Sequence, residues 1–226
     1  MRFARTRFAL AGLAALSFLG SACGPDAVTP APAPKTWPAW DPRTLCETST
    51  QGLLAPTSQS DLQDILEQVQ AAFYPELAGV DVRLQVMQSA SDYFASFTDV
   101  TTVSLPPLQR TYYVRFNPRL FSEPASYAAV AAIIAHELGH VVDYTQKDTD
   151  ALVQFALWYG TASDVSAYEH TTDERSLSLG CGTGLKAYRE WLYAHVSTAT
   201  MVQKEHDYYT PAQIDAWTAE HPDAQR

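Results

Sequence analysis

The 226-residue sequence has few cysteines, few cationic side chains and only one long apolar run. Its three cysteines lie far apart, which excludes the closely paired cysteines of a zinc ribbon. Its 15 basic residues are outnumbered by 25 acidic residues, and the resulting formal net charge of −10 argues against nucleic acid or anionic lipid as a partner. Beyond the N-terminal region, no stretch approaches the ~18 continuous apolar residues that a membrane span requires.

The apolar run lies at the N-terminus, where residues 1–22 have the composition of an export signal. Three arginines precede an apolar segment, residues 8–19, which is too short for an ordinary membrane span, and small residues follow at 20–22. Because Cys23 comes next, the segment resembles a bacterial lipoprotein signal, and this resemblance implies a lipid on that cysteine. An ordinary secretory signal cut after Ala22 is the alternative. Both predict export.

The remaining chain divides into a tether and a domain. Residues 23–39 are rich in proline and alanine, which predicts an extended tether, and residues 40–226 have the length of one ordinary domain. We therefore expect a location in the bacterial cell envelope, with the lipid at Cys23 as the only hold on a membrane, or secretion as a soluble protein. Loss of the three arginines with the signal leaves 12 of the 15 basic residues against 25 acidic residues, so the net charge of the exported chain is −13.

Cys46 and Cys181 are the two cysteines of the predicted domain. In an oxidising compartment two such cysteines are more often paired than free, which predicts a disulfide between the start of the domain and a turn near residue 181. Two separate buried thiols are the alternative.

The order of apolar patterns predicts an α+β fold. A capping sequence and helical spacing favour a helix over residues 60–73, and three segments have the character of strands, at residues 80–86, 101–105 and 111–116. A long helix is expected from Ser122 onward, and four helical segments are expected after it, at residues 151–159, 164–179, 185–196 and from 210. Gly180 is expected as a left-handed helix cap and residues 180–184 as a turn. We expect a small sheet packed on the long helix, followed by a mainly helical C-terminal half.

The strongest chemical signal is the sequence His136-Glu-Leu-Gly-His140 within the predicted long helix. Histidines at i and i+4 project from one helical face about one turn apart, the spacing that holds a zinc ion between two imidazoles. Glu137 is then placed to accept a proton from a water molecule at the zinc. The flanking residues are almost all apolar, so burying these polar side chains without a cation would be costly. The pattern predicts zinc ligation by both histidines, with Glu137 as the general base.

A catalytic zinc site uses three protein ligands and keeps one position open. Glu169 and Asp173 are spaced i and i+4 in the next long predicted helix, so one carboxylate can bind zinc while the other supports a ligand histidine. The residues alone leave three assignments open. The third ligand is Glu169, or Asp173 with Glu169 outside the site, or His170, which faces about 100° away from Glu169.

The sequence Ala135-His-Glu-Leu-Gly-His-Val141, followed by Glu169-x-x-x-Asp173, resembles the gluzincin metallopeptidases, especially the prenyl-protease-like branch. The resemblance covers residues 130–179. It implies a zincin-like fold with zinc as the cofactor, bound by His136, His140 and Glu169. It further implies that Glu137 is the general base and that Asp173 supports a ligand histidine.

These signals together predict an exported zinc metallopeptidase that hydrolyses peptide bonds in a peptide or protein substrate. We expect the strand at residues 111–116 to pair with an extended substrate. A zinc-binding envelope lipoprotein without turnover and a zinc amidase acting on cell-wall peptide are the alternatives. Five side chains have the chemistry to stabilise an oxyanion, and the sequence does not choose among them: Tyr144, Tyr168, Arg175, His195 and His206.

Overall fold

The computed structural model describes residues 44–47 and 55–225. The predicted export signal, the predicted tether and Cys23 lie outside these residues. Within them, no helix combines the length and the apolar character needed to cross a membrane.

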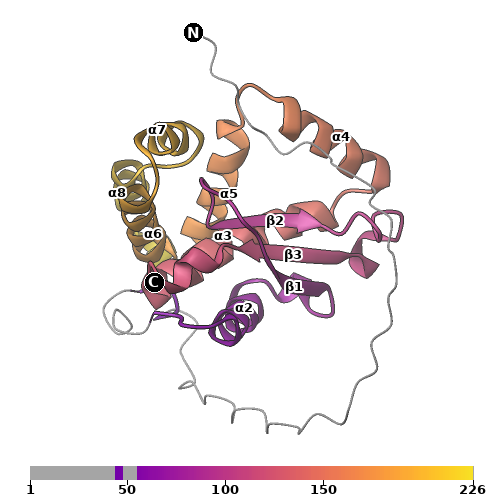
Figure 1. The fold of residues 1–226 in the computed structure, drawn as a ribbon, viewed down its shortest axis with the longest axis horizontal. Coiled ribbons are helices and arrows are strands. Elements are labelled where there is room, and N and C mark those ends of the chain that lie inside the picture. Colours follow the sequence, from indigo (N-terminus) through magenta and orange to yellow (C-terminus); the bar gives the residue numbers. More distant parts are fainter. Residues whose placement is uncertain (1–43, 48–54, 226) are drawn as a thin grey trace, which may run out of the picture. The chain divides into compact units, whose positions relative to one another are not determined.

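A three-stranded sheet forms the β part of the fold (Figure 1). Its strands are β1 (Asp81–Val86), β2 (Phe94–Thr98) and β3 (Thr111–Phe116), in the order β1-β3-β2. β1 runs parallel to β3, whereas β2 runs antiparallel to it. β3 is therefore the central strand, and β2 keeps one edge that no strand in the described residues occupies.

The helix α3 (Tyr127–Thr145) carries the H-E-x-x-H sequence and runs through the middle of the fold. It packs against β2 and against the helices α2 (Gln59–Phe73), α5 (Ser166–Ser178) and α6 (Gly182–His195). Every residue of α3 from 127 to 142 is buried. This burial on all sides explains why the sequence of the helix has no polar face.

Helices make up the C-terminal half of the chain. α4 (Thr149–Thr161) precedes α5 and α6, and α7 (Thr198–Asp207) and α8 (Pro211–Glu220) follow them. The last helix begins with the expected capping box at Thr210 and Gln213. The chain thus has the predicted α+β class, with a small sheet and a helical C-terminal half.

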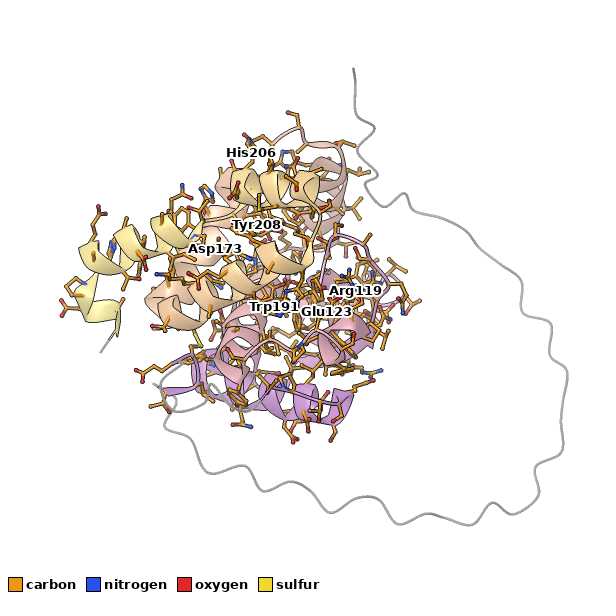
Figure 2. All side chains as sticks on the ribbon, turned by 60° about the vertical axis from the view of Figure 1, so that its left-hand side comes forward. Arg119, Glu123, Asp173, Trp191, His206 and Tyr208 are labelled. Carbon is orange, nitrogen blue, oxygen red and sulfur yellow. A yellow bond between two sulfur atoms is a disulfide. The ribbon has the colours of Figure 1, made fainter. Side chains whose placement is uncertain are left out.

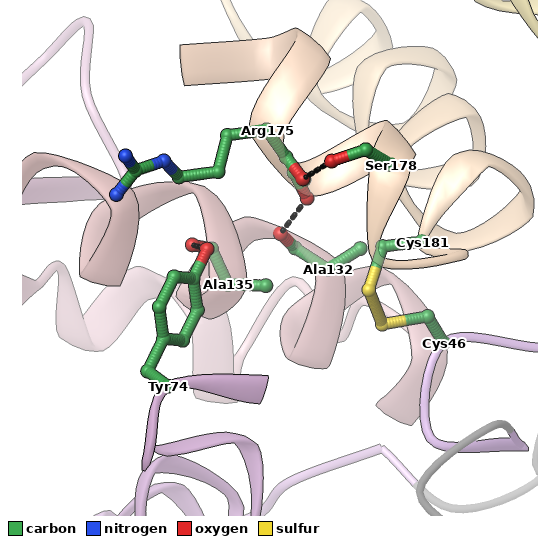
Figure 3. The surroundings of a disulfide bond; sticks show 8 residues. Cys46, Tyr74, Ala132, Ala135, Arg175, Ser178 and Cys181 are labelled. Atoms are coloured by element: carbon green, nitrogen blue, oxygen red, sulfur yellow. Dashed lines mark hydrogen bonds between the residues drawn. A yellow bond between two sulfur atoms is a disulfide. The ribbon is translucent and has the colours of Figure 1, made fainter. Parts of the chain in front are cut away.

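A disulfide joins Cys46 to Cys181, as predicted (Figure 3). It connects the short described segment at residues 44–47 to the N-terminus of α6, across a sequence separation of 135. Gly180, just before Cys181, has a φ of +84°, so it is the expected left-handed cap of α5. Nearby, the hydroxyl of Ser176 donates to the carbonyl of Ala132 at 3.3 Å. The hydrogen bond ties α5 to α3, and the disulfide ties the start of α6 to residues 44–47.

Residues 101–105 form turns, so their prediction as a strand was wrong. The carboxylate of Asp99 accepts hydrogen bonds from the N–H and the hydroxyl of Thr101, each at 2.8 Å, and the N–H of Thr102 donates to the carbonyl of Asp99 at 3.0 Å. Such local bonds offer the backbone an alternative to a sheet ladder. The edge strand is instead β2, which was not predicted.

The motif helix begins at Tyr127, so the predicted start at Ser122 was also wrong. The N–H of Ser122 donates to the carbonyl of Arg119 at 3.0 Å, and this bond ends the short 3-10 helix η4 (Pro118–Phe121). Ser126 caps α3 instead, because its hydroxyl accepts the N–H of Ala129 at 3.3 Å.

Two smaller differences occur near the C-terminus. α7 was not predicted, because its sequence has little apolar periodicity and its start is marked only by the cap at Ser197. Gly182 already begins α6, so the predicted turn at residues 180–184 ends earlier.

Candidate metal centre

The two histidines of α3 meet on one face of the helix. Nε2 of His136 lies 3.1 Å from Nε2 of His140, and the two rings are nearly perpendicular, at 87°. The residues are 1% and 6% exposed. Two imidazole nitrogens therefore converge on one point that is almost closed to solvent.

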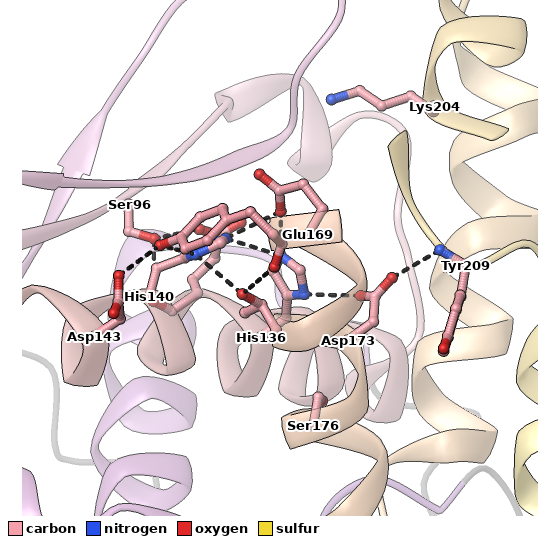
Figure 4. A network of polar contacts seen from close by, with 12 residues as sticks. Ser96, His136, His140, Asp143, Glu169, Asp173, Ser176, Lys204 and Tyr209 are labelled. Atoms are coloured by element: carbon pink, nitrogen blue, oxygen red, sulfur yellow. Dashed lines mark hydrogen bonds and ion pairs between the residues drawn. The ribbon is translucent and has the colours of Figure 1, made fainter. Parts of the chain in front are cut away.

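Glu169 reaches the same point from α5. The buried positions of this helix are Glu169, Thr172, Asp173, Ser176 and Leu177. They follow helical periodicity, so α5 turns an unusually polar face toward α3. Figure 4 shows the result, in which Oε2 of Glu169 lies 3.4 Å from Nε2 of His136 and 3.2 Å from Nε2 of His140.

The three atoms have the spacing and the chemistry of a zinc site. Ligand atoms bound tetrahedrally to one zinc ion lie about 3.3 Å apart, close to the distances observed here. Oε2 of Glu169 is buried and receives no hydrogen bond from the described part of the chain. A cation would relieve this cost, and two imidazoles with one carboxylate suit zinc better than calcium or magnesium, which prefer oxygen ligands. The geometry therefore favours Glu169 as the third side chain able to hold a metal with His136 and His140.

Asp173 supports the ring of His136. Its Oδ1 lies 2.8 Å from Nδ1 of His136 and accepts a hydrogen bond from Nη2 of Arg189 on α6 at 2.9 Å. Its Oδ2 accepts the N–H of Tyr209 at 2.9 Å. Asp173 thus lies where α5, α6 and the end of α7 come together (Figure 2). Since both of its oxygens have partners, it orients His136 from behind, and its assignment as the metal ligand in place of Glu169 is disfavoured.

His140 is held by a second chain of contacts, which was not predicted. Its Nδ1 lies 3.0 Å from the hydroxyl of Tyr168, and this hydroxyl donates to Oδ2 of Asp143 at 3.0 Å. The ring of Tyr168 also stacks on the imidazole, with centroids 5.1 Å apart. This network favours the tautomer with the proton on Nδ1, which leaves Nε2 free for a metal.

Two hydroxyl groups from other elements hold the glutamates. Ser96 on β2 donates to Oε2 of Glu137 at 2.5 Å, and Tyr159 on α4 donates to Oε1 of Glu169 at 2.5 Å. Neither residue was predicted, because each comes from an element whose place beside α3 the sequence does not reveal. Together they fix the two carboxylates in separate positions around the centre.

A small hollow lies beside Glu137, between the start of β2 and the helices α3, α6 and α7. Tyr188, Arg189, Lys204 and Tyr208 contribute to its walls. The ring centroid of Tyr208 lies 5.8 Å from that of His136, so this cavity adjoins the candidate metal centre.

His170, the rival third ligand, lies outside the centre. Its ring packs on Tyr209 with centroids 4.5 Å apart, and it is not among the side chains that surround the metal position. A second group of potential ligands, Asp164, His206 and Asp207, lies mainly at the surface. There, Asp207 is 2.9 Å from Nδ1 of His206 and accepts a hydrogen bond from Gln203, so its charge has partners without an ion.

The five predicted oxyanion candidates make other contacts. Tyr168 and Tyr144 both stack on His140. Arg175 lies on the side of α5 near Tyr74 (Figure 3). His195 stacks on Trp191, and His206 pairs with Asp207. Tyr208 was not among the predicted candidates, but its ring packs against that of His136.

Opposed effects set the charges of the centre. Burial alone would lower the pKa of His136, but the carboxylates of Asp173 and Glu169 outweigh this effect and raise the pKa to about 9. Burial alone would raise the pKa of Glu169, but the two imidazoles hold it well below its usual range. The pKa of Asp173 is lowered in the same way, against burial, by Arg189 and His136. Without a metal, the two carboxylates therefore favour a proton on His136.

No protein-family model, curated protein or solved structure matches the chain, so the proposals below rest on its own residues and geometry.

We expect Glu169→Ala to weaken zinc binding far more than Asp173→Asn does. The first change removes a direct ligand, whereas losing the partner of a ligand histidine typically costs about 10–100-fold in metal affinity. His170→Ala is the control and should leave the affinity unchanged. Titration of each variant against a competing chelator gives the order. A larger loss for Asp173→Asn, or a large loss for His170→Ala, would contradict the assignment of Glu169.

The metal-free protein should lose stability as the pH rises from about 6.5 to about 9. A pKa raised on folding means that the protonated His136 favours the fold, so its contribution is complete below the ordinary pKa and is lost through the folded-state value. Zinc binds the neutral imidazole, so the zinc-loaded protein should not show this loss. Urea unfolding at about pH 6 and about pH 9, with chelator or with zinc, measures the difference.

His136→Asn should abolish this difference, and His221→Asn, which changes an exposed histidine, should not. The same decline of stability with pH in the chelated and the zinc-loaded protein would contradict the protonated state assigned to His136.

Proposed function

We propose that the chain is an exported zinc metallopeptidase with a zincin-like fold, attached to the bacterial envelope through a lipid at Cys23. The observation that carries the proposal is the convergence of His136, His140 and Glu169 on one buried point, with Glu137 beside an adjoining cavity. A purely structural metal site has no need of a further carboxylate, Glu137, that binds no metal and lies next to a cavity. This difference favours turnover over the alternative of a non-catalytic zinc protein.

When bound, zinc would polarise the scissile carbonyl and make a water molecule more acidic. The other parts of the reaction fall to the side chains. Glu137 accepts the proton of the attacking water and delivers it to the leaving amine, which is the work of a general base and then a general acid. Ser96 holds one oxygen of Glu137 by a short hydrogen bond and so leaves the other for this proton transfer.

Tyr208 is the side chain that we assign to the developing oxyanion. It lines the cavity together with Glu137, and its ring adjoins His136. Burial raises its pKa well above the usual range, so its hydroxyl remains a hydrogen-bond donor at every working pH. A neutral donor placed beside the reacting carbonyl stabilises the charge that forms there.

The free edge of β2 is the place where an extended peptide can pair with the sheet. β3 was predicted for this role, but it is the central strand and is paired on both sides. β2 contains Ser96, whose hydroxyl donates to the side chain of Glu137 and lies 3.0 Å from the backbone carbonyl of that residue, so a peptide along this edge lies next to the general base.

Glu137→Gln should retain zinc and the fold but lose peptide hydrolysis by several orders of magnitude, because an amide cannot accept the proton. Glu67→Gln on α2 makes the same chemical change at an exposed site and should retain full activity. Digestion of an unbiased peptide library, with and without a chelator, measures both. Comparable cleavage by Glu137→Gln would contradict the base role. Failure of the zinc-loaded wild-type protein to cleave peptides or cell-wall peptide would contradict the proposed hydrolase.

Tyr208→Phe should lower kcat by about 10²–10³-fold, the typical effect of removing one oxyanion donor. Because Tyr208 is not a metal ligand, zinc affinity should remain unchanged. Steady-state kinetics and a chelator titration on the same preparation test both statements. An unchanged kcat would exclude Tyr208 from this role.

A further inference from the structure

The cavity beside Glu137 is surrounded by hydrogen-bond donors. Tyr188 and Arg189 face it from α6, Lys204 from α7, and Tyr208 from the segment that follows α7. Burial raises the pKa of Tyr188, so its hydroxyl stays protonated. Among the described residues that line the cavity, Asp92 is the only acid besides Glu137.

Both carboxylate oxygens of Asp92 already accept hydrogen bonds from neighbouring side chains. Its Oδ2 accepts hydrogen bonds from Ser89 at 3.0 Å and Ser91 at 2.6 Å, and its Oδ1 accepts one from Lys204 at 2.6 Å. These contacts disperse its negative charge away from the cavity. Its low pKa has the same origin, because the nearby ammonium and the hydroxyls outweigh the effect of burial.

Lys204 has N–H groups that are not used by its bond to Asp92. An ammonium carries three N–H groups, and within the described residues Lys204 donates one hydrogen bond, to Asp92. Its side chain is 17% exposed and its Nζ lies 5.0 Å from the ring centroid of Tyr208. Figure 4 shows the side chain reaching from α7 toward the candidate metal centre.

Arg189 provides a second, deeper cation. It is 2% exposed and its Nη2 is bound to Asp173, but its Nε is buried and has no hydrogen-bond partner among the described residues. A buried donor without a partner is costly. A cavity wall with a partly free ammonium is complementary to an acceptor with negative charge, and Arg189 adds a second positive charge to that wall.

We infer that this cavity binds a carboxylate of the substrate residue on the amine side of the scissile bond, supplied either by the C-terminus of the peptide or by an acidic side chain. The inference rests on the proposed function for its location. Glu137 must deliver its proton to the leaving amine, so the residue that carries this amine lies next to Glu137 and hence in this cavity. The charge of Glu137 repels the carboxylate and directs it toward Lys204.

Binding to the zinc-loaded Glu137→Gln protein tests the inference without turnover. Four short acetylated peptides of one sequence serve as probes, with a carboxylate or a carboxamide at the C-terminus and with a glutamate or a glutamine in the last position. Calorimetry should show Kd at least about 10-fold lower for peptides that carry a carboxylate than for the peptide with none. Preference for the terminal carboxylate alone identifies a pocket for chain ends, and preference for the glutamate alone identifies a side-chain pocket.

Lys204→Met in the same background should reduce this preference to less than about threefold, and Lys204→Arg should restore most of it. Lys186→Met is the matched control, because Lys186 also pairs with an aspartate, Asp215, but on the exposed surface between α6 and α8. Equal Kd values for all four peptides, or an equal preference in Lys204→Met and Lys186→Met, would overturn the inference.

The two proposals can fail separately. If the carboxylate preference is present but the wild-type protein cleaves none of these peptides or the library, the proposed hydrolase fails and the carboxylate site stands. If the wild-type protein cleaves peptides with no preference between acid and amide, the hydrolase stands and the carboxylate site fails.

Discussion

The arrangement of this fold depends on four ionisable side chains that are buried together between α3 and α5. His136, His140, Glu169 and Asp173 are nearly or fully inaccessible to solvent, and only Asp173 has a permanent cation beside it, Arg189. Burying such groups without compensation is expensive, and removing one partner from a buried pair costs more than the pair contributes. A divalent cation between the two imidazoles and Glu169 would compensate these charges, and without it the nearby carboxylates favour a proton on His136.

Elements far apart in the sequence keep this centre in place. The apolar sides of α3 pack against β2, α2 and α6, and the disulfide fixes the corner where α5 turns into α6. α5 contributes Glu169 and Asp173 to one face, and α6 contributes Arg189 to the support of Asp173. β2 places Ser96 on Glu137 and leaves its outer edge open. The polar face of α5, the cavity and β2 therefore all contact Glu137 or the two histidines of α3.

The sequence predicts those features of the structure that depend only on nearby residues in the chain. The i and i+4 spacing of His136 and His140 requires only a helix, and Gly180 requires only a helix end. Glu169 and Asp173 share a helical face, but their division into ligand and support came from a family resemblance, and it takes the positions of Arg189 and Tyr209 to distinguish them by geometry. Ser96, Tyr159 and Tyr208 could not be predicted, because each enters the site through tertiary packing. Tyr168 was expected only as an oxyanion candidate, and its contact with His140 also depends on tertiary packing. The prediction of a strand at residues 101–105 was wrong, because Asp99 accepts hydrogen bonds from the next residues and these bonds form a turn.

The proposed metal centre requires an ion at the point where the three ligand atoms converge. Anomalous diffraction from crystals of the protein purified with zinc, recorded on both sides of the zinc absorption edge, locates such an ion directly. We expect one strong difference peak at about 2.0–2.2 Å from Nε2 of His136, Nε2 of His140 and Oε2 of Glu169. A map without a peak at this position, or with its strongest peak at the exposed group around His206, would contradict the assignment of the metal centre.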